Sequence, residues 1–181
     1  LLKKITNAKT KDLKLFTTKL TFIPQELKGI NTKINIGTAG AISLMIQNII
    51  IPLMFAESKS IITMIGGTDV AFAPTIIYLK EVILPFFAKY THKCELTIVK
   101  HGFYPKGNGE LILEIIPKYK VEQIKKIPPL EYTKQGKVEM IQGYSIASLD
   151  LKKAYVAKRQ TTQIKKIFAD YITKIKTKYV N

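Results

Sequence analysis

The sequence predicts an α/β protein, an α+β sandwich of two layers in which helices cover one face of a mixed sheet. From residue 31 onward, short apolar runs typical of strands alternate with longer runs that have helical spacing, in the order β-α-β-α-β-β. Glycine-rich turns stand at the ends of several of these runs. A hydrophobic content of 46% is sufficient for a buried core. The chain is therefore globular.

The expected elements of this central region follow from periodicity. We expect a strand at 33–36, a helix at 41–55, a strand at 60–65, a helix at 75–89, and strands at 94–100 and 110–116. In the second helix, apolar residues recur at helical spacing, which packing against the sheet explains. Pro85 lies inside that helix and is expected to kink or shorten it, because proline lacks the N–H group.

Two further regions flank this repeat. Residues 1–30 are interpreted as the end of a preceding repeat, since residues 1–5 look like the end of a helix. Residues 31–136 hold the central repeat, whose last part is a lysine-rich and proline-containing exposed connection from 117 onward. Residues 137–181 are predicted to form a strand at 138–145 and a long basic helix at 152–176, with no strand after it.

The composition favours an anionic partner. The chain has 29 basic and 13 acidic residues and a formal net charge of +16. A field of this size attracts polyanions, nucleic acid first among them, although a lysine-rich solvated surface would have the same composition. Arg159 is the single arginine, so lysines must make most contacts with phosphate.

Two features bear on the cellular setting. Cys94 is the one cysteine, which excludes an internal disulfide and a cysteine-rich zinc site and fits a buried strand thiol in a reducing cytoplasm. Residues 39–56 are strongly apolar, but the run is short for a membrane span and contains Gln47 and Pro52. We interpret it as a buried helix and expect no membrane partner.

The loop that begins at His101 has the most informative sequence. The run His101-Gly-Phe-Tyr-Pro-Lys-Gly-Asn-Gly-Glu110 holds three glycines and a proline between two strand-like runs. Such loops often bind phosphate through exposed amides, and Lys106 would add a cation. A hairpin loop that only turns the chain is the commoner case.

Further motifs occur in order with this loop. They are Ile36-Gly-Thr-Ala-Gly-Ala41, a helix carrying Gln47, Gly66-Gly-Thr-Asp69, and Ala73-Pro74. Together the motifs resemble the RNA 3′-terminal phosphate cyclase family, in its true cyclase branch, over nearly the whole chain. The resemblance implies a central fragment that lacks the family's N-terminal and C-terminal parts: one repeat of the large domain and the beginning of a smaller inserted α/β domain.

The resemblance also implies an activity. The family is a ligase class that uses ATP to convert an RNA 3′-phosphate to a 2′,3′-cyclic phosphodiester, through covalent histidine-AMP and RNA-adenylate intermediates. A divalent metal, Mg or Mn, would assist nucleotidyl transfer. No residue here matches the family's nucleophilic histidine, so no catalytic residue is assigned in this chain. A separately encoded polypeptide could supply the missing parts.

Two residues are assigned to ATP binding by the resemblance. Gln47 matches a glutamine that contacts ATP, and Pro74 matches a proline whose ring packs against adenine. Alternatively, Gln47 is a core or sheet-edge amide with satisfied hydrogen bonds, and Pro74 opens a helix at its first position. The turn at Thr38 and Gly40 would place an anion at a helix N-terminus, whereas an N-cap role for Thr38 or Ser43 explains it equally well.

His101 and Lys106 are candidates for binding RNA or phosphate, with Lys106 as a charge partner. Asp69 is expected to order its turn or cap the next helix rather than bind a metal or ribose. Asn108 replaces a family glycine, but asparagine tolerates the left-handed conformation. His92 is expected to be exposed, in a connection between a helix and a strand.

Two other functions stay open. One is that of the cyclase-like protein of ribosome biogenesis, which acts in ribosomal RNA processing without cyclising ends. The other is a non-catalytic RNA-binding module that uses Lys100, Lys106 and the 152–176 helix, for which salt-sensitive RNA binding without ATP affinity would be diagnostic.

Overall fold

The structure, a computed structural model, describes residues 1–180. The chain divides into two compact units, Leu1–Pro128 and Pro129–Asn181. The first unit contains a four-stranded sheet and a short hairpin, and the second contains a two-stranded sheet. The predicted α+β architecture is confirmed.

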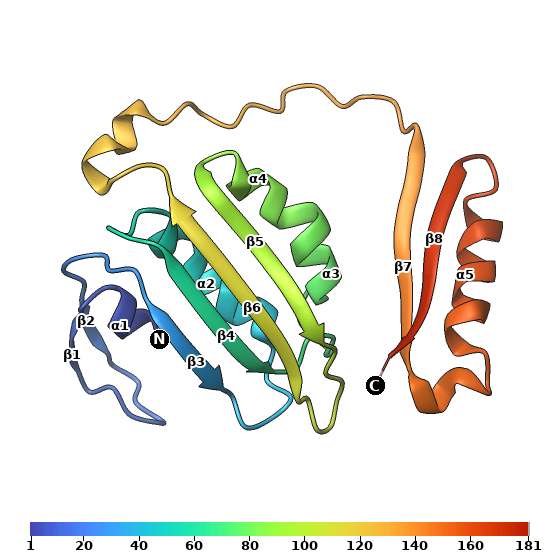
Figure 1. Ribbon diagram of the computed structural model, residues 1–181, viewed down its shortest axis with the longest axis horizontal. Coiled ribbons are helices and arrows are strands. Elements are labelled where there is room, and N and C mark those ends of the chain that lie inside the picture. Colours follow the sequence, from blue (N-terminus) through green and yellow to red (C-terminus); the bar gives the residue numbers. More distant parts are fainter. Residues whose placement is uncertain (181) are drawn as a thin grey trace. The chain divides into compact units, whose positions relative to one another are not determined.

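The sheet of the first unit is mixed. Its strands are β3 (Asn31–Asn35), β4 (Ser60–Gly66), β5 (Thr91–Lys100) and β6 (Gly109–Pro117), in the spatial order β3-β4-β6-β5. β3 and β4 are parallel, whereas β6 is antiparallel to both of its neighbours, β4 and β5. Helix α2 (Ile42–Met54) and the helical segment between β4 and β5 lie on one face of the sheet (Figure 1). The predicted β-α-β-α-β-β order is therefore correct.

The core lies between these two layers. Every second residue of β4 and of β6 is buried over most of each strand, as expected for strands with one covered face. α2 contributes Ile42, Ile46, Ile49, Ile50 and Leu53, each at most 2% exposed. These side chains pack in one cluster with Ile62, Met64, Leu111 and Leu113 of the sheet.

The helical segment between β4 and β5 is irregular around Pro85. It consists of α3 (Ile76–Tyr78), a π-helical turn (Leu79–Ile83) and α4 (Leu84–Ala88). The Leu84 N–H group donates to the carbonyl oxygen of Leu79, five residues earlier. Pro85 has no N–H to donate to a preceding carbonyl, and a wider turn just before it accommodates that loss. The helix thus continues past Pro85 instead of ending there.

The start of the chain covers one side of α2. Helix α1 (Leu2–Ile5) brings Ile5, which is fully buried, into the same core cluster. Strands β1 (Lys9–Lys11) and β2 (Thr21–Ile23) pair as an antiparallel hairpin. A helix at residues 1–5 was predicted, and the hairpin was not.

The second unit is a β-α-β motif. β7 (Met140–Ser148) leads through a 3-10 turn (Leu149–Lys152) to α5 (Val156–Ile167), and β8 (Ile172–Val180) returns parallel to β7. The Ser145 hydroxyl donates to the carbonyl oxygen of Ala157 at 2.9 Å, which ties β7 to α5. Before this unit, residues 121–126 form a short 3-10 helix in the exposed connection.

The predicted helix at 152–176 is wrong in its second half. α5 ends at Ile167, and the prediction that no strand follows is contradicted by β8. From Ile172 to Val180, β-branched residues alternate with Lys174, Lys176 and Lys178, which is a period of two rather than 3.6. Parallel pairing with β7 over nine register positions, from Ile172 opposite Met140 to Val180 opposite Ser148, holds this strand.

The open face of the first sheet carries ion pairs. The Glu114 carboxylate lies between two lysines, at 2.6 Å from Lys59 Nζ and 2.5 Å from Lys93 Nζ. Hydrogen bonds from Lys59 and Lys93 lower the pKa of Glu114, and the hydrogen bond to Glu114 is the largest cause that raises the pKa of Lys93. Charge pairing therefore replaces apolar packing on this face.

None of the helices within residues 1–180 has both the length and the apolar composition that a membrane span requires. The helix predicted at 41–55 is α2, whose apolar side faces the sheet.

We expect Glu114→Gln to destabilise the fold in a pH-dependent way. Because the folded-state pKa of Glu114 is lowered, its contribution is present at neutral pH and is lost as pH falls through that lowered pKa. Urea denaturation at pH 7 and pH 3 should show a larger deficit in the free energy of unfolding at pH 7 than at pH 3. Glu122→Gln is the control, since Glu122 makes no ion pair within residues 1–180. An equal deficit at both pH values would contradict this account.

Candidate functional site

Three glycine turns meet at one end of the four-stranded sheet. They are the 37–40 turn after β3, the 66–69 turn after β4, and the 101–109 loop between β5 and β6. The Gly67 N–H donates to the carbonyl oxygen of Gly40 at 2.9 Å, and the Ile42 N–H donates to that of Gly67 at 2.9 Å. The first two turns are thus joined directly through their backbones.

Thr68 joins the 66–69 turn to the 101–109 loop. Its side chain is buried, and its Oγ1 accepts a hydrogen bond from the Gly102 N–H at 2.9 Å. In return, the Thr68 N–H donates to the carbonyl oxygen of Gly102 at 2.9 Å. The same hydroxyl lies 2.7 Å from Asp69 Oδ2, to which it donates. Thr68 therefore fixes both turns and one acidic side chain.

Glycine is required where these backbones approach each other. A Cβ atom on Gly107 would lie 2.8 Å from the carbonyl oxygen of Thr38, and one on Gly67 would lie 2.4 Å from that of Ala39. Gly107 also has φ +68°, in the left-handed region that favours glycine. Any larger residue would push the turns apart.

Two glycine amides of the 101–109 loop are hydrogen-bonded within the protein. The Gly102 N–H is bonded to Thr68 Oγ1, and the Gly107 N–H donates to the carbonyl oxygen of Phe103 at 2.7 Å. These amides are not exposed donors for a phosphate. At Asn108, φ is +56°, so the predicted tolerance of asparagine for the left-handed conformation is confirmed.

His101 and Asp69 form a pair at the surface of this junction. His101 Nδ1 lies 2.8 Å from Asp69 Oδ2, and the two side chains are 11% and 15% exposed. A carboxylate can only accept, so the Nδ1–H tautomer donates to it. The ring also stacks on Phe103, with centroids 6.2 Å apart and planes at 11°. Asp69 therefore orders its turn, as expected, and also orients His101.

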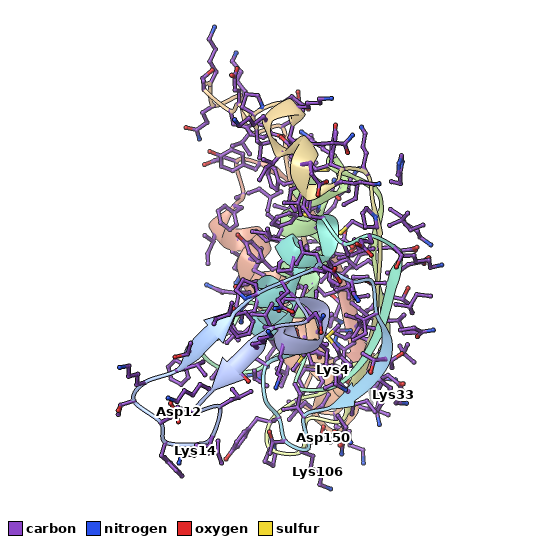
Figure 2. The ribbon with its side chains drawn as sticks, turned by 90° about the vertical axis from the view of Figure 1, so that its left-hand side faces the viewer. Lys4, Asp12, Lys14, Lys33, Lys106 and Asp150 are labelled. Carbon is purple, nitrogen blue, oxygen red and sulfur yellow. The ribbon has the colours of Figure 1, made fainter. Side chains whose placement is uncertain are left out.

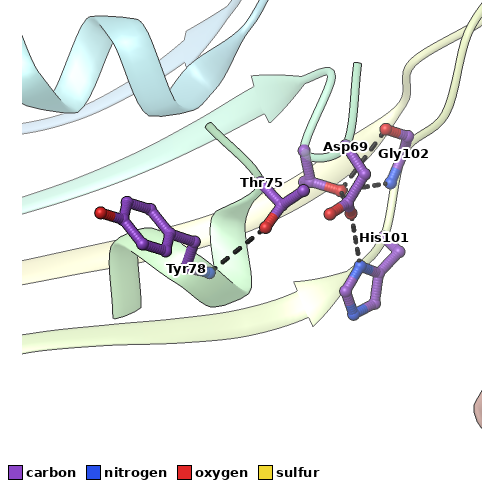
Figure 3. Close-up of polar contacts among 6 residues, drawn as sticks. Asp69, Thr75, Tyr78, His101 and Gly102 are labelled. Carbon is purple, nitrogen blue, oxygen red and sulfur yellow. Dashed lines mark hydrogen bonds and ion pairs between the residues drawn. The ribbon is translucent and has the colours of Figure 1, made fainter. Parts of the chain in front are cut away.

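The other ring nitrogen of His101 is available. Figure 3 shows the ring with its second nitrogen directed away from Asp69. No hydrogen bond to Nε2 occurs within residues 1–180. With Nδ1–H donating to Asp69, Nε2 of the neutral ring is an acceptor, and the imidazolium form can donate from Nε2 to a phosphate.

Lys106 lies at the tip of the same loop. Its side chain is exposed and extends away from the ribbon (Figure 2). Lys106 makes no ion pair in the described part of the chain. This ammonium group is free to contact an anion.

Gln47 lies on the outer side of α2. It is exposed, and its neighbours at helical spacing, Leu44 and Ile51, are 41% and 56% exposed. The interpretation of Gln47 as a satisfied core amide is wrong, because Ile46 and Ile50 occupy the side of α2 that faces the sheet. Its amide is accessible to a ligand.

The ends of the helices differ from the prediction. α2 has Ala41 at its N-cap, without a side-chain hydrogen bond, so neither Thr38 nor Ser43 caps it. Thr38 Oγ1 instead accepts from the Gly40 N–H at 3.2 Å within its turn. Thr75 is the N-cap of α3 and accepts from the Tyr78 N–H at 3.3 Å. Half-buried Pro74 therefore precedes the cap and does not open the helix at its first position.

Two other predicted features lie elsewhere. Cys94 is half-buried in β5, and burial raises the pKa of its thiol to about 11, so it is an unreactive strand thiol. His92 is exposed, as predicted, although it lies within β5 rather than in a connection. Within residues 1–180, no three His, Cys, Asp or Glu side chains are close enough together to hold a metal ion.

The fold and this junction define a class: a two-layer α/β repeat whose glycine turns gather at one end of the sheet. The sequence profile of the RNA 3′-terminal phosphate cyclase family matches residues 1–175. The chain belongs to that family.

Curated relatives agree with this assignment. The chain is 41% identical over 113 residues to a protein from Archaeoglobus fulgidus, 62% of this chain and 34% of the relative. It is 34% identical over 171 residues to one from Saccharolobus islandicus strain M.14.25, 93% of this chain and 47% of the relative. Both relatives are named RNA 3′-terminal phosphate cyclase. The chain thus spans from about a third to about half of their length.

We expect Thr68→Val to lower the free energy of unfolding by about 1–3 kcal/mol, because the buried Gly102 N–H loses its acceptor. Thr68→Ser should restore most of the loss. Thr63→Val is the control, since the Thr63 side chain lies on the open face of β4 and has no hydrogen bond within residues 1–180. Urea denaturation measures all three variants. Similar values for Thr68→Val and Thr63→Val would contradict the assigned role.

Proposed function

We propose that this chain forms the central part of an RNA 3′-terminal phosphate cyclase that uses ATP to convert an RNA 3′-phosphate to a 2′,3′-cyclic phosphodiester. Family membership supports the reaction class. The observation that carries the proposal is the junction of the three turns through Thr68 and Gly102, which gathers the shared motifs into one site.

The proposed reaction consists of three displacements at phosphorus. A histidine nitrogen attacks the α-phosphorus of ATP and pyrophosphate leaves. An oxygen of the RNA 3′-phosphate then attacks that phosphorus and the histidine leaves. Finally the neighbouring 2′-oxygen attacks the 3′-phosphorus, its proton passes to a base, and AMP leaves. In this proposal the nucleophilic histidine lies outside these 181 residues, which fits the share of the relatives that the chain spans.

The RNA end is proposed to bind at His101 and Lys106. Asp69 holds the imidazole so that Nε2 faces outward, and Lys106 adds an unpaired cation on the same loop. Charge-assisted hydrogen bonds to phosphate are stronger than neutral ones, so Lys106 and the imidazolium form of His101 favour a dianionic 3′-phosphate over a 3′-hydroxyl.

ATP is proposed to bind beside the start of α2. Gln47 presents an exposed amide that can hydrogen-bond a nucleotide, and half-buried Pro74 offers a rigid apolar ring for adenine, next to the capped start of α3. A hydrogen-bonding amide and an apolar ring are groups that suit an adenine nucleotide. A divalent metal, Mg or Mn, would be held through the triphosphate oxygens, as Mg²⁺ commonly is. A cytoplasmic location and a second polypeptide that supplies the remaining segments belong to the same proposal.

A second candidate is a non-catalytic RNA-binding module. The net charge of +16 and the unpaired cation at Lys106 favour it, because both support binding without any nucleotide chemistry. ATP binding distinguishes the two candidate functions, because only the cyclase requires it.

We expect Gln47→Ala to weaken ATP binding by about twofold to tenfold, the effect of one hydrogen bond. Isothermal titration with magnesium and ATP should compare the chain alone with the chain mixed with the polypeptide that supplies the remaining family segments. Asn48→Ala is the matched control, because Asn48 is an exposed amide on the same helix whose side chain donates to Leu44 O. Equal losses in both variants, or no ATP binding in either condition, would count against the cyclase.

We expect His101→Gln and Lys106→Gln each to reduce the preference for a 3′-phosphate over a 3′-hydroxyl RNA by about tenfold or more, the effect of a charge-assisted hydrogen bond. Fluorescence anisotropy with two otherwise identical oligonucleotides measures that preference. His92→Gln is the control, since His92 is exposed and lies at the start of β5, whereas His101 follows the end of that strand. A preference that survives both substitutions would place the RNA end elsewhere.

A further inference from the structure

The outward face of α5 carries an open hollow. Its volume is about 420 Å³, and its lining residues are Tyr155, Lys158, Arg159 and Thr162. These four positions share one helical face by their spacing. The opposite face is the one that packs on the strands, where Ala157 is fully buried and Thr161 lies 2.8 Å from Thr177 of β8, between their hydroxyl oxygens. The hollow therefore faces solvent within the second unit.

This face is basic and lacks compensating acids. α5 carries Lys158, Arg159, Lys165 and Lys166 and no acidic residue. The guanidinium of Arg159, the single arginine of the chain, makes no ion pair within residues 1–180. Unpaired guanidinium groups bind phosphate in a bidentate manner, which lysine cannot do. Arg159 is therefore open to an anionic ligand.

Tyr155, the N-cap of α5, has an unusual backbone conformation. It has φ +53° and ψ +30°, a left-handed conformation that bulky residues rarely adopt, and its side chain is 62% exposed. The ring gains little from burial, and Lys158 Nζ lies 5.9 Å from its centroid. A strained position that presents an exposed aromatic ring beside two cations suggests a role in binding.

We propose that this face of α5 binds single-stranded RNA. Tyr155 stacks on an unpaired base, while Lys158 and Arg159 contact the phosphates on either side of it. Thr162 Oγ1 already donates to the carbonyl oxygen of Lys158 at 3.1 Å, so it remains an acceptor for a ribose 2′-hydroxyl. The surface holds the body of the RNA rather than its 3′ end. The identity of this RNA as a substrate rests on the proposed function.

Fluorescence anisotropy of the whole chain with a labelled single-stranded RNA that ends in a 3′-hydroxyl tests this inference. Lys158→Gln/Arg159→Gln should weaken binding at least tenfold, and the slope of log K against log salt should become shallower by about 1.4, for two lost phosphate contacts. Lys125→Gln/Lys126→Gln removes the same charge from an exposed 3-10 helix and should weaken binding less than about threefold. Circular dichroism confirms that each variant is folded.

The stacking contact has its own test. Tyr155→Phe should bind as the wild type does, whereas Tyr155→Leu should lose roughly fivefold or more, the effect of one stacked base. Equal losses in the two double variants, or equal binding by the Phe and Leu variants, would overturn the inference. So would a duplex RNA that binds as tightly as the single strand.

The two proposals fail separately. If the α5 variants bind RNA normally while the 3′-phosphate preference persists, only the α5 surface is wrong. If the α5 variants lose affinity but the wild type shows no preference for a 3′-phosphate, the α5 surface stands and the proposed function fails.

Discussion

The close contact between the 66–69 turn and the 101–109 loop is the constraint on which the candidate site depends. Thr68 and Gly102 exchange hydrogen bonds across it, and the Thr68 hydroxyl also holds Asp69. The strands that lead to these turns, β4 and β6, are antiparallel and pair at Gly66 and Gly109, which brings the turns into register. Without this contact, His101 would have neither a partner nor a fixed orientation.

At this junction the backbone amides hold the turns together, and the side chains around it are left to contact a ligand. The amides of Gly67, Gly102 and Gly107 are hydrogen-bonded within the protein, so these three donors are not open to a phosphate. The groups left for a ligand at its rim are Nε2 of His101 and the ammonium of Lys106, while the exposed amide of Gln47 lies on the outer side of α2. In the proposed cyclase, a rigid interior would hold these groups in position, and rigid positioning is what phosphoryl chemistry requires.

Local patterns in the sequence predict much of this fold. The periodicity of residues 42–54 and 60–66 was sufficient for α2 and β4, because one face of each element is apolar. The helix predicted from periodicity is wrong at residues 172–180. Apolar residues continue there past α5, but they alternate with lysine at a period of two, which is that of a strand. The pair of Asp69 and His101 had no local signal. These residues lie 32 positions apart, and only the register of β4, β5 and β6 brings them together.

Chemical-shift mapping of the backbone amides tests the central claim most directly, by comparing a dinucleotide that ends in a 3′-phosphate with the same dinucleotide ending in a 3′-hydroxyl. The account predicts that shifts specific to the 3′-phosphate cluster at His101 to Lys106 and at Thr68 and Asp69, where the two turns meet. Phosphate-specific shifts confined to other parts of the chain, or no difference between the two dinucleotides, would contradict it.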